Sequence, residues 1–212
     1  VSRGGQKLAG ALDDTGLDAA GLDAIDLGAS TGGFTDCLLQ RGASRVIAVD
    51  VGYGQLAWSL RNDPRVTVME RTNARHLTPQ DLPFAPALVV CDVAFISIAT
   101  IWPAVARCAA PGFTALMMVK PQFEVGRGQV GSGGVVRDPR LHHGAIMRVA
   151  EAIERERGVV AVVAASRLVG PKGNREFFIL ARDATCGTER IDVGAAADRA
   201  RASCRPRRRS DP

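Results

Sequence analysis

The chain reads Ala24-Ile25-Asp26-Leu27-Gly28-Ala29-Ser30-Thr31-Gly32-Gly33-Phe34, an apolar run that leads into a glycine-rich turn. A second apolar run, Arg45-Val46-Ile47-Ala48-Val49, then ends in the carboxylate of Asp50. This pattern predicts a strand, a turn, a helix and a second strand. Glycines let a ligand approach the backbone, and a helix begins with unpaired N–H groups. Because a carboxylate at the tip of the second strand can accept hydrogen bonds from both hydroxyls of a ribose, the pattern predicts a nucleoside cofactor.

The spacing of the glycines separates one nucleoside cofactor from another. Dinucleotide folds carry G-x-G-x-x-G, whereas this turn reads Gly28-x-x-x-Gly32-Gly33, and the chain has no G-x-x-x-x-G-K-[ST] phosphate loop. Asp26, just before the turn, would repel a pyrophosphate but suits a cationic ligand. S-adenosylmethionine carries an ammonium and a sulfonium group. An ordinary strand–helix turn is the alternative, and Asp26 together with Asp50 favours a methyltransferase over it.

The composition is that of a globular α/β domain. The chain has 212 residues, of which 46% are hydrophobic and 23% charged, enough for one well-buried core. Its five cysteines lack C-x-x-C spacing and no secretion signal is apparent, so we expect reduced thiols and a cytoplasmic protein. The most apolar stretch, 87–110, is interrupted by Asp92, Pro103 and Arg107, which favours a buried strand and helix over a membrane span. The three histidines lack ligand spacing, so no metal is expected.

The charge of the chain favours an anionic partner. The formal net charge is +5 and the pI is near 9.3. Only three of the 27 basic residues are lysines, namely Lys7, Lys120 and Lys172. An amine can lose its proton and a guanidinium effectively cannot, which marks these lysines as candidates for chemistry. Residues 183–212 are rich in arginine and lack apolar periodicity, so we expect a disordered basic tail, either simply solvated or acting as a phosphate-binding arm.

Strand and helix patterns alternate along the chain. Strands are expected at about 23–29, 45–51, 66–71, 86–93 and 113–120, and helices at about 1–16, 34–41, 55–62, 98–109 and 139–157. Two further apolar runs, 159–168 and 176–181, have no helix between them and predict a hairpin. The sequence therefore predicts an α/β domain over residues 1–182 of the class I (Rossmann-like) methyltransferase type. Its seven-stranded sheet would be mostly parallel, with a C-terminal antiparallel hairpin strand.

Three ionisable residues fall at one edge of this predicted sheet, where ligands bind in such folds. Asp92 and Lys120 end the fourth and fifth strands, and Glu176 begins the last, reversed strand. A salt bridge that closes the sheet edge is one interpretation, and catalysis is the other. Base N-methyltransferases carry [DNS]-P-P-[YFW] here, but this chain has Asp92-Val93-Ala94-Phe95. A ribose 2′-hydroxyl needs a group to take or share its proton, and a lysine flanked by carboxylates can be positioned to do this.

Several segments, taken together, resemble the TlyA family. These haemolysin-like proteins are, despite the name, ribosomal RNA cytidine-2′-O-methyltransferases related to FtsJ. The resemblance extends over about residues 1–182. The segments are Val1-Ser2-Arg3-Gly4-Gly5-Gln6-Lys7-Leu8, residues 26–38, Val49-Asp50-Val51-Gly52-Tyr53-Gly54-Gln55-Leu56, Glu70-Arg71-Thr72-Asn73-Ala74-Arg75 and Lys120-Pro121-Gln122-Phe123-Glu124.

The resemblance implies a set of site residues. The family's Lys-Asp-Lys-Glu tetrad would be Lys7, Asp92, Lys120 and Glu176. Lys120 would be the central catalytic lysine, Asp92 and Glu176 would orient it and the hydroxyl, and Lys7 would steer the ribose or contact RNA. The residues expected to contact S-adenosylmethionine are Asp26, Gly28, Ser30, Gly32, Gly33, Phe34, Asp50, Val51, Asn73 and Asp92.

The resemblance also implies a partner and a larger architecture. The substrate would be 16S or 23S ribosomal RNA, or both, free or within ribosomal subunits. Family members usually begin with a small S4-type RNA-binding domain, and this chain is expected to start where that domain and its linker end. Apart from the resemblance, the glycine-rich segment 121–137 follows the carboxyl end of a predicted strand and is expected to be one long irregular loop with a function.

Two other functions compete with an enzyme. A membrane-active haemolysin would need a spanning helix or a long amphipathic face rich in tryptophan and lysine, whereas the chain has two tryptophans and three lysines. A non-catalytic RNA-binding module could keep the fold without the reaction, but Asp92, Lys120 and Glu176 are all present. The sequence therefore favours the methyltransferase.

Overall fold

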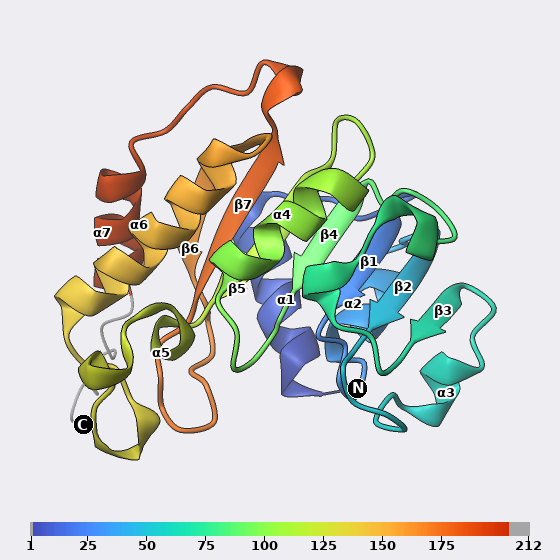
Figure 1. The fold of residues 1–212 in the computed structure, drawn as a ribbon, viewed down its shortest axis with the longest axis horizontal. Coiled ribbons are helices and arrows are strands. Elements are labelled where there is room, and N and C mark those ends of the chain that lie inside the picture. The colour runs from blue at the N-terminus through green and yellow to red at the C-terminus, as the bar shows by residue number, and fades with distance from the viewer. Residues whose placement is uncertain (1, 204–212) are drawn as a thin grey trace, which may run out of the picture.

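The computed structural model describes residues 2–203, which form a seven-stranded sheet with helices on both faces (Figure 1). The strands lie in the order β3-β2-β1-β4-β5-β7-β6. The five strands β3, β2, β1, β4 and β5 run parallel to one another, and β7 lies between β5 and β6, antiparallel to both. This confirms the expected fold class, including the reversed strand. The strands are β1 (Asp23–Leu27), β2 (Arg45–Val49), β3 (Val66–Met69), β4 (Leu88–Cys91), β5 (Thr114–Val119), β6 (Gly158–Ala165) and β7 (Phe177–Asp183).

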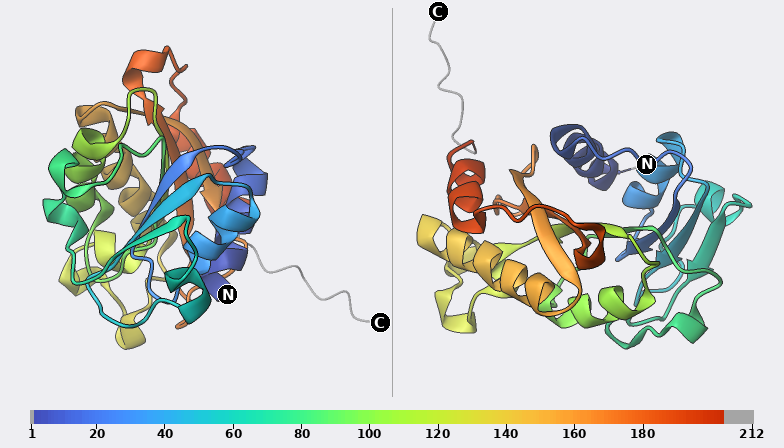
Figure 2. Two further views of the ribbon diagram at one scale, coloured as in Figure 1. Left: turned by 90° about the vertical axis from the view of Figure 1, so that its right-hand side faces the viewer. Right: turned by 90° about the horizontal axis from the view of Figure 1, so that it is seen from above.

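Two layers of helices bury the sheet (Figure 2). On one face α1 and α2 pack together, and Leu8, Leu12 and Leu38 fill the space beneath them. On the other face α4 and α6 cover the sheet with Trp102 and Ile146. The central strands are buried on both sides, which explains why they read as continuous apolar runs. The α-helices are α1 (Arg3–Thr15), α2 (Gly33–Gln40), α3 (Trp58–Arg61), α4 (Ile98–Cys108), α5 (Pro121–Glu124), α6 (Pro139–Arg155) and α7 (Val193–Ser203).

Local sequence signals set several helix ends. The side chain of Ser97 accepts a hydrogen bond from Ala99 N (3.1 Å) at the start of α4. Asp138 likewise accepts Arg140 N (2.8 Å) before α6, whose first residue is a proline. Gly16 ends α1 in the left-handed region, at φ +65°. These caps satisfy backbone groups that a helix end leaves unpaired.

The expectation of a disordered chain from Asp183 onward is wrong for the residues that the structure describes. A short turn, η5 (Ala184–Cys186), follows β7, and residues 193–203 form α7. This helix packs along β6 and against α6, burying Ala196, Ala197 and Ala200. Its apolar face consists of alanines among charged residues, so the apolar pattern in the sequence is weak. Residues 204–212, the rest of the predicted tail, lie outside the described part of the chain.

The glycine-rich segment 121–137 is built from short helical pieces rather than one irregular loop. After α5 come η3 (Arg127–Gln129) and η4 (Ser132–Gly134). Asn174, from the connection between β6 and β7, makes two hydrogen bonds to the backbone just after η4. Its Oδ1 accepts a hydrogen bond from Val136 N (2.9 Å), and its Nδ2 donates one to Gly134 O (2.8 Å). The segment is thereby attached to the same sheet edge at which β7 begins.

Candidate active site

The glycine turn after β1 forms one wall of the site. Gly28 and Gly32 both have positive φ, at +87° and +94°. A Cβ on Gly28 would lie 2.8 Å from the carbonyl oxygen of Asp92, and one on Gly32 would lie 2.2 Å from Leu60 Cδ1. Only glycine fits either position. The turn therefore passes close to the end of β4, where Asp92 is located.

The carboxylate of Asp50 connects this turn to the end of β2. Its Oδ2 accepts a hydrogen bond from Ser30 N (2.8 Å), and its Oδ1 accepts one from Gly52 N (2.7 Å). Ser30 itself has φ +49°, an uncommon conformation for a residue with a side chain, and this hydrogen bond holds it there. A carboxylate has about four lone-pair sites, so Asp50 keeps acceptor capacity toward the cavity that it lines.

Asp26 lies beneath the turn and does not line this cavity, contrary to the expectation that it contacts the cofactor directly. The residue is fully buried, and its Oδ2 accepts hydrogen bonds from Thr35 N (2.9 Å) and Thr35 Oγ1 (2.7 Å) in the first turn of α2. Its Oδ1 is buried without a hydrogen-bond partner. Burial raises the pKa of Asp26 to about 7, and the hydrogen bonds from Thr35 oppose the shift. Asp26 thus anchors the start of α2.

The cavity itself has a volume of about 490 Å³, within the usual range for small-ligand sites. Its walls come from the carboxyl ends of β1, β2, β4 and β5 and from the start of α1. Gly32 and Asp26 are absent from the lining, whereas the other residues expected to contact the cofactor are present. Those residues are Gly28, Ser30, Gly33, Phe34, Asp50, Val51, Asn73 and Asp92.

Lys120 and Asp92 form an ion pair on the cavity wall. Lys120 Nζ lies 2.6 Å from Asp92 Oδ1, and the two side chains are 13% and 22% exposed. That oxygen accepts no aligned hydrogen bond, so the contact is ionic. Both residues follow directly after a buried parallel strand, β5 and β4 respectively. The ammonium is therefore held at the point where a ligand in the cavity meets the sheet.

Lys7 and Glu176 form a second, separate pair. Lys7 Nζ donates to Glu176 Oε2 at 2.5 Å, and the side chains are only 8% and 2% exposed. Neither residue lines the cavity. The four residues of the expected tetrad therefore lie in two ion pairs: one on the cavity wall, and one buried between α1 and the start of β7.

Three further features received no role from the sequence: two belong to the cavity lining, and the third is the buried carboxylate of Glu124. Ser2 and Gly4, at the start of α1, line the cavity. Phe95 is 91% exposed, has φ +66°, and its ring lies 5.2 Å from that of Phe123. Buried Glu124 accepts Ser97 Oγ (2.5 Å) and Ile98 N (2.8 Å), so it fixes the start of α4 to α5. Burial raises the pKa of Glu124. Ser2, Gly4, Phe123 and Glu124 lie in motifs that carry the family resemblance, whereas Phe95, Ser97 and Ile98 lie outside those motifs.

The strand order and this cavity at the carboxyl edge define a class I S-adenosylmethionine-dependent methyltransferase. Residues 1–183 match the FtsJ-like methyltransferase family. The chain belongs to that family. A Mycobacterium tuberculosis protein named "16S/23S rRNA (cytidine-2'-O)-methyltransferase TlyA" is 54% identical over 185 residues, which are 87% of this chain and 69% of that protein. The resemblance to TlyA proteins is thereby confirmed.

Two solved structures bear on the fold. A protein from Streptococcus thermophilus, described as a candidate hemolysin, has a TM-score of 0.89 and 40% identity, covering 96% of this chain and 73% of that one. An S-adenosylmethionine-dependent methyltransferase from Mesorhizobium loti has a TM-score of 0.62 at 16% identity, covering 83% of this chain and 97% of the other. The second likeness shows the fold alone. Within residues 2–203, no helix is both long and apolar enough to span a bilayer.

Proposed function

We propose that this protein transfers a methyl group from S-adenosylmethionine to the ribose 2′-hydroxyl of a cytidine in ribosomal RNA. The observation that carries the proposal is the Lys120–Asp92 ion pair on the wall of the same cavity that the glycine turn and Asp50 line. The identity with the Mycobacterium tuberculosis protein supports the same reaction and the same nucleotide.

The residues of the cavity suit the cofactor. Asp50, already held by Ser30 N and Gly52 N, keeps lone pairs for the two hydroxyls of the cofactor ribose. The backbone of Gly28 and Gly33 forms part of the lining, and the absence of side chains lets the turn pack closely against Asp92 and the start of α1. When bound, the cofactor supplies an activated methyl group on a sulfonium sulfur. The absence of a basic side chain from the turn is compatible with a ligand that carries positive charge.

Lys120 and Asp92 then act on the acceptor. A ribose hydroxyl is a poor nucleophile until a neighbouring group takes or shares its proton. Lys120 Nζ is the group on the cavity wall that can hold that oxygen or accept its proton, and Asp92 holds the ammonium in place. The hydroxyl proton can pass to Lys120 Nζ only after the ammonium has released a proton of its own to Asp92 or to solvent; the new oxygen–carbon bond then forms as the carbon–sulfur bond of the methyl donor breaks. Much of the acceleration comes from alignment, since displacement requires the two reactants in line.

Lys7 and Glu176 would act as positioning residues. Their pair joins α1, whose first residues line the cavity, to the start of β7. They therefore set the wall of the cavity next to the acceptor rather than touching it. The family tetrad would thus divide into a catalytic pair and a positioning pair.

The proposed substrate also sets where the reaction takes place. A nucleotide within folded RNA must leave its helix to reach such a cavity. We assign segment 121–137 to covering the extruded nucleotide, because it begins at Lys120 and lies on the same sheet edge. We also propose a cytoplasmic location, because ribosomal RNA would be the substrate and the cysteines lack C-x-x-C spacing.

A methyl-transfer assay tests the proposal. Purified protein is incubated with labelled S-adenosylmethionine and with either naked ribosomal RNA or assembled subunits, and the modified position is mapped. We expect label on the 2′-oxygen of a cytidine. Label on a base, or none with either substrate, would overturn the proposal. The haemolysin alternative is tested separately with dye-loaded liposomes, where dye release at the concentrations used for methylation would favour it.

A further inference from the structure

A second concavity lies outside the active site, over the carboxyl end of β6. We call it the β6 groove. It has a volume of about 850 Å³, and its walls come from α1, β6, the connection after β6, and α7. In the right-hand view of Figure 2, α1 and α7 stand on either side of β6. The groove is open at the surface, and the proposed reaction makes no use of it.

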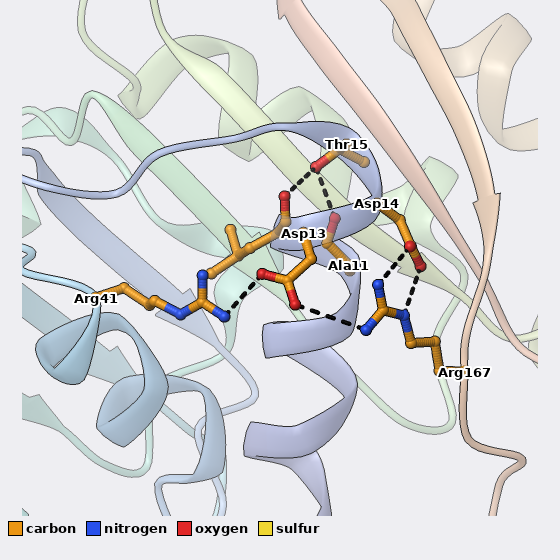
Figure 3. Close-up of polar contacts among 7 residues, drawn as sticks. Ala11, Asp13, Asp14, Thr15, Arg41 and Arg167 are labelled. Atoms are coloured by element: carbon orange, nitrogen blue, oxygen red, sulfur yellow. Dashed lines mark hydrogen bonds and ion pairs between the residues drawn. The ribbon is translucent and has the colours of Figure 1, made fainter.

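The groove is lined by three arginines, Arg167, Arg175 and Arg199. Figure 3 shows Arg167 reaching the end of α1, where its guanidinium lies 2.6 Å from Asp14 and 3.6 Å from Asp13. Within residues 2–203, Arg175 and Arg199 form no ion pair. Two arginines of the groove lining therefore have no counter-ion among residues 2–203.

The carboxylates of the groove do not neutralise this charge. Asp14 is engaged by Arg167, and Glu176 by Lys7. The β6 groove therefore keeps an excess of positive charge, which an anionic ligand would neutralise.

The groove adjoins the active site. Glu176 lines the groove and holds Lys7 of α1. Val169 also lines the groove, and its carbonyl accepts Arg3 Nη2 (3.0 Å), between Ser2 and Gly4 of the active-site wall. The first turns of α1 thus separate the two concavities. A long polymer bound in the groove could continue into the active site.

We propose that the β6 groove binds the sugar-phosphate backbone of the substrate RNA, with Arg175 and Arg199 each contacting a phosphate. The proposal rests on the proposed function, which makes RNA the substrate. A guanidinium matches a phosphate in geometry, and grooves that track nucleic-acid backbones combine such charges with a concave surface. Contacts of this kind position the RNA without reading its sequence. These phosphate contacts would determine which nucleotide of the RNA reaches Lys120.

The test compares salt dependence in charge-matched variants. Arg175→Gln/Arg199→Gln removes two charges from the groove. Arg155→Gln/Arg190→Gln removes two charges from exposed arginines outside it, each paired with a glutamate. Affinity for naked ribosomal RNA is measured at several salt concentrations for both variants and the unaltered chain. Cofactor affinity and melting temperature serve as controls for folding.

We expect the groove variant to bind RNA about tenfold more weakly. Its plot of log affinity against log salt should be shallower by about 1.4 to 1.8, the value for two lost phosphate contacts. The control variant should keep the slope of the unaltered chain. Arg199→Gln alone is decisive if Arg175→Gln disturbs its neighbour Glu176, since Arg199 lies on α7, away from that residue, and should lose about half of the effect.

Unchanged RNA affinity and salt slope in the groove variant, with normal methyl transfer by the unaltered chain, would contradict RNA binding in the β6 groove and leave the proposed function intact. Weaker binding to assembled subunits with unchanged binding to naked RNA would overturn it in favour of a ribosomal-protein partner. If the unaltered chain transfers no methyl group to ribose, the proposed function fails. The salt slopes of RNA binding still show whether the β6 groove binds RNA.

Discussion

The ammonium of Lys7 and the carboxylate of Glu176 lie 2.5 Å apart in the interior, although the residues are 169 positions apart in the chain. The contact joins the first helix to the start of the last strand. Moving a charged group from water into the protein interior costs several kcal/mol of free energy unless a partner of opposite charge compensates for it. Each of these residues therefore depends on the other, and both can affect the site without touching its ligands.

Removing one partner of this pair should be more harmful than removing both. Glu176→Gln leaves Lys7 buried without a counter-ion and should lower the free energy of unfolding by about 3–5 kcal/mol. Lys7→Met/Glu176→Leu removes both charges and should recover most of that loss, measured by urea unfolding. We expect methyl transfer by the double variant to remain low, because α1 and β7 lose the contact that positions them. Full methyl transfer by the double variant would contradict the positioning role.

Lys120→Arg should separate proton handling from charge. Arginine keeps the positive charge beside Asp92 but cannot give up its proton, so most of the rate should be lost while the melting temperature stays unchanged. The measurement is single-turnover methyl transfer with saturating cofactor. Near-normal turnover by the arginine variant would show that Lys120 only contributes charge. A drop in melting temperature would instead assign it a structural role.

Asp50 should determine cofactor affinity. Asp50→Ala removes both acceptors for the cofactor ribose and should weaken S-adenosylmethionine binding by about 1.5–3 kcal/mol, measured by calorimetry. Asp63→Ala is a suitable control, because Asp63 pairs with exposed Arg65 and does not line the cavity. Equal cofactor affinities for Asp50→Ala and the unaltered chain would remove Asp50 from the binding site.

Asp26 should make stability depend on pH near neutrality. Burial raises its pKa to about 7, above the ordinary value of 3.8 expected for the unfolded chain. The folded protein therefore binds the proton more tightly. This stabilising contribution is fully present below about pH 4 and is lost as the pH rises through about 7.

Asp26→Asn tests this dependence, because asparagine cannot ionise and can still accept a hydrogen bond from Thr35. Between pH 5 and 7, the unaltered chain should lose stability relative to the variant by up to about 1.4 kcal/mol per pH unit. Urea unfolding of both proteins at several pH values measures the difference. A difference that is constant over this range would mean that Asp26 ionises normally.

Strand order and strand ends could be predicted from the sequence because they follow from local patterns. Apolar runs that end in Asp50, Asp92 and Lys120 mark one sheet edge, since parallel strands end there together. The absence of a helix between the last two runs was enough to predict the reversal of β7. These features need only the period of the pattern and the right-handed connection of parallel strands.

The pairing of side chains could not be predicted in the same way. The strand pattern placed Asp92, Lys120 and Glu176 at one sheet edge, and the family resemblance added Lys7. The division into Lys120–Asp92 and Lys7–Glu176 depends on the contact between α1 and the start of β7, which no local pattern reveals. Asp26 was expected to contact the cofactor because a carboxylate beside the turn suits a cationic ligand, whereas the structure shows that carboxylate accepting hydrogen bonds from Thr35. The alanine face of α7 gave too weak an apolar signal to predict a helix.

The reversed direction of β7 also leaves a convenient point for chemical labelling. Its end at Asp183 lies at the amino ends of β5 and β6, opposite the active site, and Cys186 follows in η5. Cys186 is exposed, whereas Cys37, Cys91 and Cys108 are buried, and burial raises the pKa of each of those three thiols. In a Cys204→Ser variant, a thiol-reactive fluorophore should therefore attach at Cys186. Ligand binding could then be followed optically by a reporter that touches neither the cavity nor the β6 groove.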